Sequence, residues 1–187
     1  MASPRVTIEL PPWVDDFVDW RRRYPRLEDR MALVIAVGHE QVRRATGGPF
    51  AAAVFERDTG GLVAVGVNLA VPAHNCALHA EIVALMMAGA RLHHHSLGAR
   101  GLPAHDLVTS CEPCAMCLGA TLWSGVARLV TGATKSDAEA VGYDEGPVFA
   151  ESYDHLERRG IVVVREVLRT EAREVLQAYQ AAGGDLY

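Results

Sequence analysis

The sequence predicts an α/β protein: a three-layer α/β/α sandwich with a mixed five-stranded sheet. Two apolar runs, 50–56 and 62–68, flank the turn sequence Asp-Thr-Gly-Gly at 58–61, which is typical of a β-hairpin. Farther along the chain, short apolar runs alternate with helical patterns, as expected for strands that are joined by helical crossovers. An antiparallel hairpin followed by helix-linked strands makes a mixed sheet, and the helices would cover both of its faces.

Each element is expected from its own local pattern. A helix over 28–46 carries a broad apolar face that includes Met31, Val34 and Ile35, and two glycines end it. Three histidines at 93–95 lie in an expected loop and are interpreted as surface residues. The remaining elements are a helix over 79–89, a loop over 91–104, a strand ending near Thr109, a helix over 114–124, a strand over 127–132, a short helix over 135–141, a loop over 143–147, a strand over 161–164 and a helix over 170–182.

The expected division of the chain is an N-terminal extension over 1–25 and a single domain over 26–187. A chain of 187 residues is long enough for one domain with a substantial core. In the extension, Trp13, Phe17 and Trp20 recur at helical spacing. We expect these aromatic side chains to dock on the domain or on a second subunit.

Composition excludes several classes of protein. The formal net charge is −5 and Lys135 is the one lysine among 18 lysine and arginine residues, which argues against an extended phosphate-binding surface and hence against a nucleic-acid partner. Apolar runs stay below the ~20 residues of a membrane span, and the acidic N-terminal region is unlike a signal peptide. The chain has four cysteines, three of them clustered, and this number and spacing are unlike those of a disulfide-stabilised protein. The cytoplasm is the expected compartment.

Two short segments carry the chemistry: His-Ala-Glu at 79–81 and Pro-Cys-Ala-Met-Cys at 113–117. They supply one imidazole, two thiolates and a carboxylate. Three protein ligands leave a tetrahedral zinc ion with one open position, which is typical of a catalytic site. The metal lowers the pKa of its bound water, and Glu81 is placed to carry the proton.

The local pattern supports a shared site. Pro113 suits a first helical turn, and Cys114 and Cys117 then lie on one face of a helix N-terminus. The helix dipole there favours thiolates over thiols. His79 also precedes an apolar helical run, so two helix starts are expected to face one metal ion.

Other interpretations of these residues remain open. The cysteine pair alone is compatible with a redox dithiol, and Cys111 or Cys76 would close a structural zinc site as a fourth ligand. An iron–sulfur ligand run is disfavoured because Thr121 and Leu122 stand where a fourth Cys and a Pro would be needed. Three protein ligands plus water would indicate an enzyme, whereas four protein ligands would indicate a non-enzymatic interaction module.

Longer matches extend the two short segments. They are His-Ala-Glu-Ile at 79–82, Ser-Cys-Glu-Pro-Cys-Ala-Met-Cys-Leu-Gly-Ala at 110–120 and Val-Gly-Tyr-Asp-Glu-Gly-Pro at 141–147. From about residue 28 onward, the chain resembles the cytidine deaminase superfamily of zinc deaminases, whose motif these segments contain. Within it, the chain is similar to the nucleobase branch represented by bacterial guanine deaminases, including a subgroup that also acts on aminotriazines. The resemblance implies a cytidine deaminase-like fold.

The resemblance also implies roles for individual residues. Zinc would be held by His79, Cys114 and Cys117, and Glu81 would shuttle protons. Asn68 would hold the base through its amide, while Glu145 would recognise the purine and assist the proton transfers. Phe50, Trp123 and Tyr143 would line the ring pocket. The alternatives are that Phe50 and Trp123 belong to the core and that Asn68 caps a turn.

The function expected from this resemblance is zinc-dependent hydrolytic deamination of guanine to xanthine, with release of ammonia. Cytosine, a nucleoside or an aminotriazine remain alternative substrates, and a tRNA adenosine deaminase is the nearest competing activity. The resemblance also implies a homodimer. The C-terminal segment 183–187 is short, and whether it closes the site in its own or in a second subunit stays open.

Overall fold

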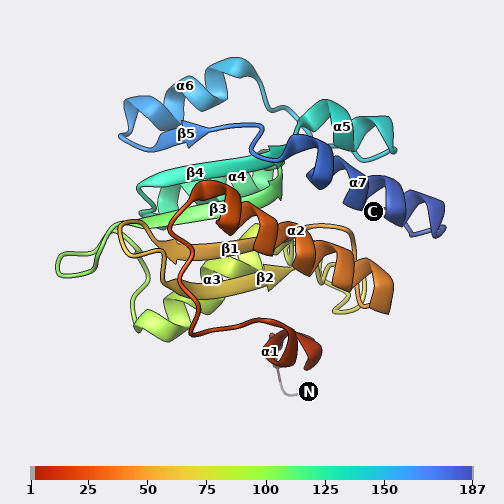
Figure 1. Cartoon of the computed structure of the whole chain (residues 1–187), viewed down its shortest axis with the longest axis horizontal. Helices are drawn as coiled ribbons and strands as arrows, with labels where there is room; N and C mark the ends of the chain where they lie inside the picture. The colour runs from red at the N-terminus through yellow and green to blue at the C-terminus, as the bar shows by residue number, and fades with distance from the viewer. Residues whose placement is uncertain (1–2, 187) are drawn as a thin grey trace.

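Five strands form one open sheet in the order β2-β1-β3-β4-β5 (Figure 1). In this computed structural model, which describes residues 3–186, β1 is antiparallel to β2 and β3, whereas β3, β4 and β5 are parallel. The strands are β1 Ala51–Glu56, β2 Leu62–Val67, β3 His105–Cys111, β4 Arg128–Ala133 and β5 Val162–Val164. The predicted mixed five-stranded sheet is therefore confirmed.

Helices cover both faces of the sheet, as the sequence predicts. The helices are α1 Trp13–Phe17, α2 Leu27–Arg44, α3 Ala80–Leu92, α4 Ala115–Ser124, α5 Lys135–Ala140, α6 Ala150–Arg158 and α7 Arg169–Ala181. Helices α2 and α7 pack on one face, and α3 and α4 lie behind the sheet in the view of Figure 1. The result is the expected three-layer sandwich.

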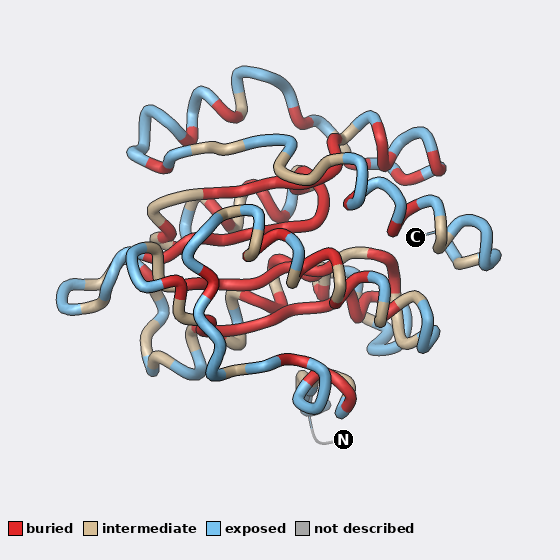
Figure 2. The backbone as a smooth tube through the Cα atoms, in the orientation of Figure 1, coloured by how far each residue is buried: buried red, intermediate tan, exposed pale blue. Residues whose placement is uncertain are grey.

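Strand β1 shows how one strand serves two cores. Ala51, Ala53 and Phe55 belong to the apolar cluster beneath α2, whereas Ala52 and Val54 belong to the cluster beneath α3. Successive side chains of a strand point to opposite faces, so a strand that is covered on both sides is apolar throughout. The strands at the centre of the sheet are accordingly buried along most of their length (Figure 2).

The β1–β2 hairpin turns where the sequence places its glycines. Gly60 has φ +68°, and a Cβ on it would lie 2.4 Å from the carbonyl oxygen of Tyr24. The same glycine accepts a hydrogen bond from the backbone N–H of Tyr24 at 2.9 Å. Only glycine meets both conditions, because it tolerates positive φ and has no side chain to clash.

The N-terminal residues pack against the rest of the chain. Trp13 is buried, and its indole N–H donates a hydrogen bond to the hydroxyl of Thr46 at 3.1 Å. The Arg91 guanidinium lies over the ring of Trp20, 4.6 Å from its centroid. Within residues 3–186, no helix combines the length and the apolar character that a membrane crossing requires.

Helix α6 is not predicted from the sequence. The sequence predicts no element over 148–160, yet Ala150–Arg158 is helical. Its buried residues are only Tyr153 and Leu156, so its apolar stripe is too short to stand out in a polar segment. This helix contributes to the same apolar cluster as α3 and α4.

Candidate active site

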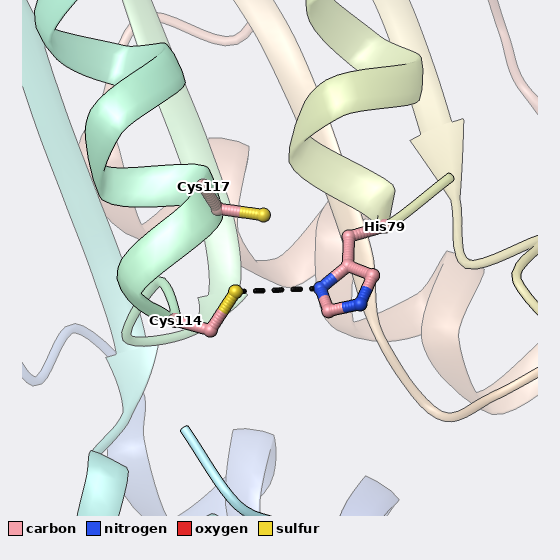
Figure 3. Close-up of side chains that lie close together, drawn as sticks. All are labelled: His79, Cys114 and Cys117. Atoms are coloured by element: carbon pink, nitrogen blue, oxygen red, sulfur yellow. Dashed lines mark hydrogen bonds between the residues drawn. The ribbon is translucent and has the colours of Figure 1, made fainter. Parts of the chain in front are cut away.

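Two helix N-termini converge on one point between α3 and α4 (Figure 3). His79 is the N-cap residue of α3 and Cys114 is the N-cap residue of α4, with Cys117 in the first turn after it. The Sγ of Cys114 lies 3.5 Å from Nδ1 of His79. One ligating atom from each of these three side chains lies within 4.8 Å of the others. The expected convergence of two helix starts is confirmed.

The topology explains why these residues meet. Strands β3 and β4 are parallel, so the segments that follow them emerge at the same edge of the sheet. Cys114 follows β3 by this route, while Asn68 directly follows β2, which runs in the same direction because both strands are antiparallel to β1. Carboxyl ends of strands are the usual place for ligand sites in open α/β sheets.

Protons are shared unequally among the three ligating side chains. Hydrogen bonding with Cys117, helped by His79, lowers the pKa of the Cys114 thiol to about 4. The same contact with Cys114, together with burial, raises the pKa of Cys117. The bond to Cys114 also raises the pKa of His79. The cluster therefore places the Cys114 thiolate next to the Cys117 and His79 side chains, which hold protons. A divalent cation bound by all three side chains would displace those protons.

Two buried carboxyl groups face this cluster. Burial raises the pKa of Glu81, which is 6% exposed, and the Cys114 thiolate adds to the effect. Burial likewise raises the pKa of Glu145 to about 8, with further contributions from the negative charges of Glu81 and Cys114. A raised pKa suits a carboxyl group for general acid–base chemistry.

A narrow cavity of about 30 Å³ opens beside the cluster. Its lining residues are Phe50, Asn68, His79, Glu81, Glu112, Cys114, Tyr143, Asp144 and Glu145. The rings of Phe50 and Tyr143 meet edge to face, with their centroids 4.8 Å apart. The structure thus brings together two aromatic rings, the Asn68 amide, the His79 imidazole and the carboxyl groups of Glu81 and Glu145.

Asn68 combines the two interpretations that the sequence left open. Its Oδ1 accepts a hydrogen bond from the backbone N–H of Ala70 at 3.1 Å, so the side chain caps a turn. Its Nδ2 is buried and has no hydrogen-bond partner among residues 3–186. A buried donor without a partner is costly, and a bound acceptor would satisfy it.

Trp123 does not line this cavity within its own chain, which corrects the sequence prediction. The side chain is 72% exposed near the end of α4, and Arg159 lies over its ring, 5.6 Å from the centroid. It lines a different and wider hollow of about 540 Å³, together with residues of α3 and its following loop. Sequence spacing does not determine on which side of the short helix α4 the ring lies. The exposure of Trp123 also excludes the alternative that it is a core residue.

Glu112 and Asp144 line the cavity although sequence reasoning gave them no role. Glu112 is buried, and its carboxylate accepts hydrogen bonds from the backbone N–H of Lys135 at 2.8 Å and from the guanidinium of Arg165. Asp144 Oδ1 accepts from the backbone N–H of Gly146 at 2.9 Å. The only sequence signal was their position inside matched segments.

Neither further cysteine joins the ligating group. Cys111 is buried and its Sγ lies 3.5 Å from the carbonyl oxygen of Thr134, while Cys76 is exposed. In the described part of the chain, the group that could hold a metal ion consists of His79, Cys114 and Cys117. A fourth protein ligand from either cysteine is thus not in place.

The C-terminal segment approaches the same region within one chain. The side chain of Leu186 lies against Gly142, whose Cβ position would be 2.7 Å from it. The hydroxyl of Tyr179 donates to the carbonyl oxygen of Asp185 at 3.0 Å. Tyr187, the last residue of this segment, lies outside the described residues.

Comparison with known proteins supports a common origin for this arrangement. Residues 26–133 match the family model of the cytidine and deoxycytidylate deaminase zinc-binding region. Guanine deaminase of Bacillus subtilis (strain 168) is 32% identical over 146 residues, which cover 78% of this chain and 88% of that protein.

Solved structures give a fuller match. Guanine deaminase from Nitrosomonas europaea is 46% identical, with a TM-score of 0.91 over 97% of this chain and 99% of that one. The protein NE0047 in complex with 2,6-diaminopurine is 48% identical, with a TM-score of 0.91 over 97% of this chain and 95% of that one. The matched segment and the fold agree, and the chain belongs to the cytidine and deoxycytidylate deaminase family.

Proposed function

We propose that His79, Cys114 and Cys117 hold a catalytic zinc ion. Ordinary Zn–S and Zn–N bond lengths place sulfur and nitrogen about 3.5 Å apart at a tetrahedral centre. The separation between Cys114 Sγ and His79 Nδ1 is 3.5 Å. Imidazole and thiolate are also the ligands that zinc prefers. This agreement between donor set and spacing carries the proposal, and three protein ligands leave one position for water.

The reaction that follows is hydrolytic deamination of guanine to xanthine, with release of ammonia. Zinc at such a site lowers the pKa of a coordinated water, so that hydroxide is available near neutral pH. Glu81 would accept one proton from the attacking water and deliver it to the ring nitrogen next to the amine-bearing carbon. It would then take the remaining proton from the added hydroxyl group and transfer it to the amine, which leaves as ammonia while the carbonyl group of xanthine forms. The burial that raises its pKa suits a group that both accepts and returns a proton.

Recognition of the base falls to the remaining cavity residues. Asn68 Nδ2 donates to an acceptor on the base, which satisfies its buried N–H groups. Glu145 accepts from ring N–H or amino groups, and Phe50 and Tyr143 pack against the ring. The cavity of about 30 Å³ holds little more than a water molecule, so a purine enters only when part of the wall moves outward.

Guanine is favoured over other bases by the relatives. Two of them are named guanine deaminases, and NE0047 was solved with 2,6-diaminopurine, a purine with two exocyclic amino groups. A free base also agrees with the formal net charge of −5, because a tRNA substrate calls for basic surface.

A substrate panel tests this function. Ammonia release is measured with guanine, guanosine, cytosine, cytidine, adenine, ammeline and a tRNA anticodon stem-loop. We expect guanine to react far faster than the others, because a cavity that leaves Asn68 or Glu145 unpaired rejects the wrong base. Reaction with the RNA alone or with nucleosides alone would contradict the free-base assignment.

We also propose that the chain forms a homodimer through α3 and α4. Met86, Met116 and Trp123 are 46%, 38% and 72% exposed on these helices, and the hollow of about 540 Å³ lies between the two. Exposed apolar surface of this kind marks an interaction site. Sedimentation should give a dimer for the wild type and a monomer for Trp123→Glu. The control is Val6→Glu, which alters an equally exposed side chain at 73% and should remain dimeric. A monomeric wild type at micromolar concentration would contradict the proposal.

A further inference from the structure

Lys135 is the one lysine of the chain, and it is the first residue of α5. Its Nζ donates a hydrogen bond to the carbonyl oxygen of Gly146 at 2.7 Å and lies 3.4 Å from the carbonyl oxygen of Val148. A third neighbour is the carboxylate of Glu139, 3.6 Å away on the same helix. The ammonium group thus joins α5 to two carbonyl groups of one loop.

That loop, residues 143–148, carries Glu145 into the cavity. The carbonyl oxygen of Glu145 accepts from the backbone N–H of Ala115 at 3.0 Å, which attaches the loop to α4. Gly146 follows with φ +67°, and its carbonyl oxygen also accepts from the N–H of Val148 at 2.8 Å. Ala115 therefore fixes the loop at Glu145 itself, and Lys135 fixes it at two residues that follow, Gly146 and Val148.

The start of α5 is itself held firmly. Glu112, two residues before Cys114, accepts the backbone N–H of Lys135 at 2.8 Å and also binds the Arg165 guanidinium. Thr134 and Asp137 form a reciprocal capping box around the same helix start. A continuous set of hydrogen bonds therefore leads from the segment of the metal-ligating cysteines, through Lys135, to the loop of Glu145.

We propose that Lys135 is a positioning residue that fixes the 143–148 loop through its carbonyl groups and so holds Glu145 at the deaminase site. The inference rests on the proposed function for the role of Glu145. A compact ammonium with three donors can bind two converging carbonyl oxygens, whereas a planar guanidinium presents its donors in a fixed fork. This difference accounts for the use of lysine here in a chain that otherwise uses arginine.

Lys135→Met tests the proposal, with Glu139→Gln as the matched control. The methionine keeps the aliphatic length of the side chain but removes its N–H donors, whereas the control removes only the exposed ion-pair partner. We expect Lys135→Met to keep its zinc and to lose at least about tenfold in kcat/KM for guanine, since small misplacements of a catalytic group are costly. Glu139→Gln should match the wild type. If Lys135→Met does not fold, Lys135→Gln, which keeps one donor group, should show a loss in the same direction.

A double-mutant cycle separates positioning from general stabilisation. If Lys135 acts through Glu145, then Lys135→Met should cause no further loss in a Glu145→Gln background. An equal fold-loss in both backgrounds would overturn the proposal, as would an unchanged Lys135→Met enzyme.

Hydrogen exchange of the loop gives a readout that does not depend on guanine. Amides of 143–148 should exchange faster in zinc-loaded Lys135→Met than in the wild type, and Glu139→Gln should not differ. If exchange is faster in Lys135→Met but the wild type does not deaminate guanine, the proposed function is refuted while the anchoring of the loop is supported. Unchanged exchange would overturn the anchoring itself.

Discussion

The Sγ of Cys114 lies 3.5 Å from Nδ1 of His79, although 35 positions separate the two residues in the sequence. Each is the N-cap residue of its helix, so the positive ends of α3 and α4 meet where the thiolate stands. The fold therefore places one imidazole and two cysteine sulfur atoms together, a donor set that suits a soft cation.

Metal content should depend on the cysteines at the helix start. Cys114→Ala removes a ligand from a three-ligand site, and we expect the purified variant to lose both its zinc and its activity. The control is Cys76→Ser, which changes an exposed cysteine outside the group and should hold about one zinc per chain. Elemental analysis of the two proteins makes the comparison. Full zinc content in Cys114→Ala would refute the ligand assignment.

Glu81 should separate metal binding from proton transfer. Glu81→Gln preserves the shape of the side chain but cannot accept a proton, so zinc content should stay and kcat should fall by at least ~10²-fold. Glu151→Gln, which changes an exposed glutamate in α6, is the control and should leave kcat unchanged. Turnover close to that of the wild type in Glu81→Gln would remove this residue from the mechanism.

Asn68 should contribute to binding of the base through its Nδ2, which has no hydrogen-bond partner among the described residues. Asn68→Asp keeps an oxygen for the Ala70 N–H and hence keeps the turn, but it replaces the donor that faces the base. We expect both Asn68→Asp and Asn68→Ala to bind 8-azaguanine at least about tenfold more weakly, because each loses a buried hydrogen bond to the ligand. Calorimetry on zinc-loaded proteins measures the change. Wild-type affinity in Asn68→Asp would show that the amide serves the turn alone.

Asp137 should contribute stability that depends on pH. Hydrogen bonds from Arg169, with help from Thr134, lower the pKa of Asp137 to about 2 from an ordinary value of 3.8. A pKa that is lower in the folded state means that the contribution is complete above pH ~4 and is lost as the pH falls toward 2.

The comparison is between wild type and Asp137→Asn in urea unfolding. The variant should be about 1 kcal/mol less stable at neutral pH, the usual size of a lost helix cap, and the difference should shrink below pH ~4. Glu166→Gln removes the other, half-exposed partner of Arg169 and should change the free energy of unfolding little. A difference that stays constant down to pH ~3 would contradict the assigned role.

The sequence predicts most of the fold because its signals are local. The hairpin follows from glycines at a turn, and α2 from a periodic apolar face that ends at two glycines. Helix α6 was missed because only Tyr153 and Leu156 are buried along it. A short polar helix gains its stability from tertiary packing, which a local pattern does not contain.

The site is predictable to the extent that its residues form motifs. His79, Cys114 and Cys117 are predictable because ligand types and spacing are distinctive. The direction of the Trp123 side chain is not, because spacing does not fix it, and within one chain its ring lines the wider hollow. In the sequence, Lys135 is distinctive only as the one lysine of the chain. Its contact with Gly146 joins a helix start to a loop carbonyl, and such a contact is visible only in three dimensions.

The most direct test of the account is to follow guanine in water labelled with heavy oxygen. Zinc-loaded protein should convert guanine to xanthine that carries one heavy oxygen atom, with one ammonia released for each xanthine formed, because the oxygen comes from water. Mass spectrometry of the product and an ammonia assay give the two quantities. Xanthine without the label, or no xanthine from a protein that holds its zinc, would contradict hydrolytic deamination of guanine by this chain.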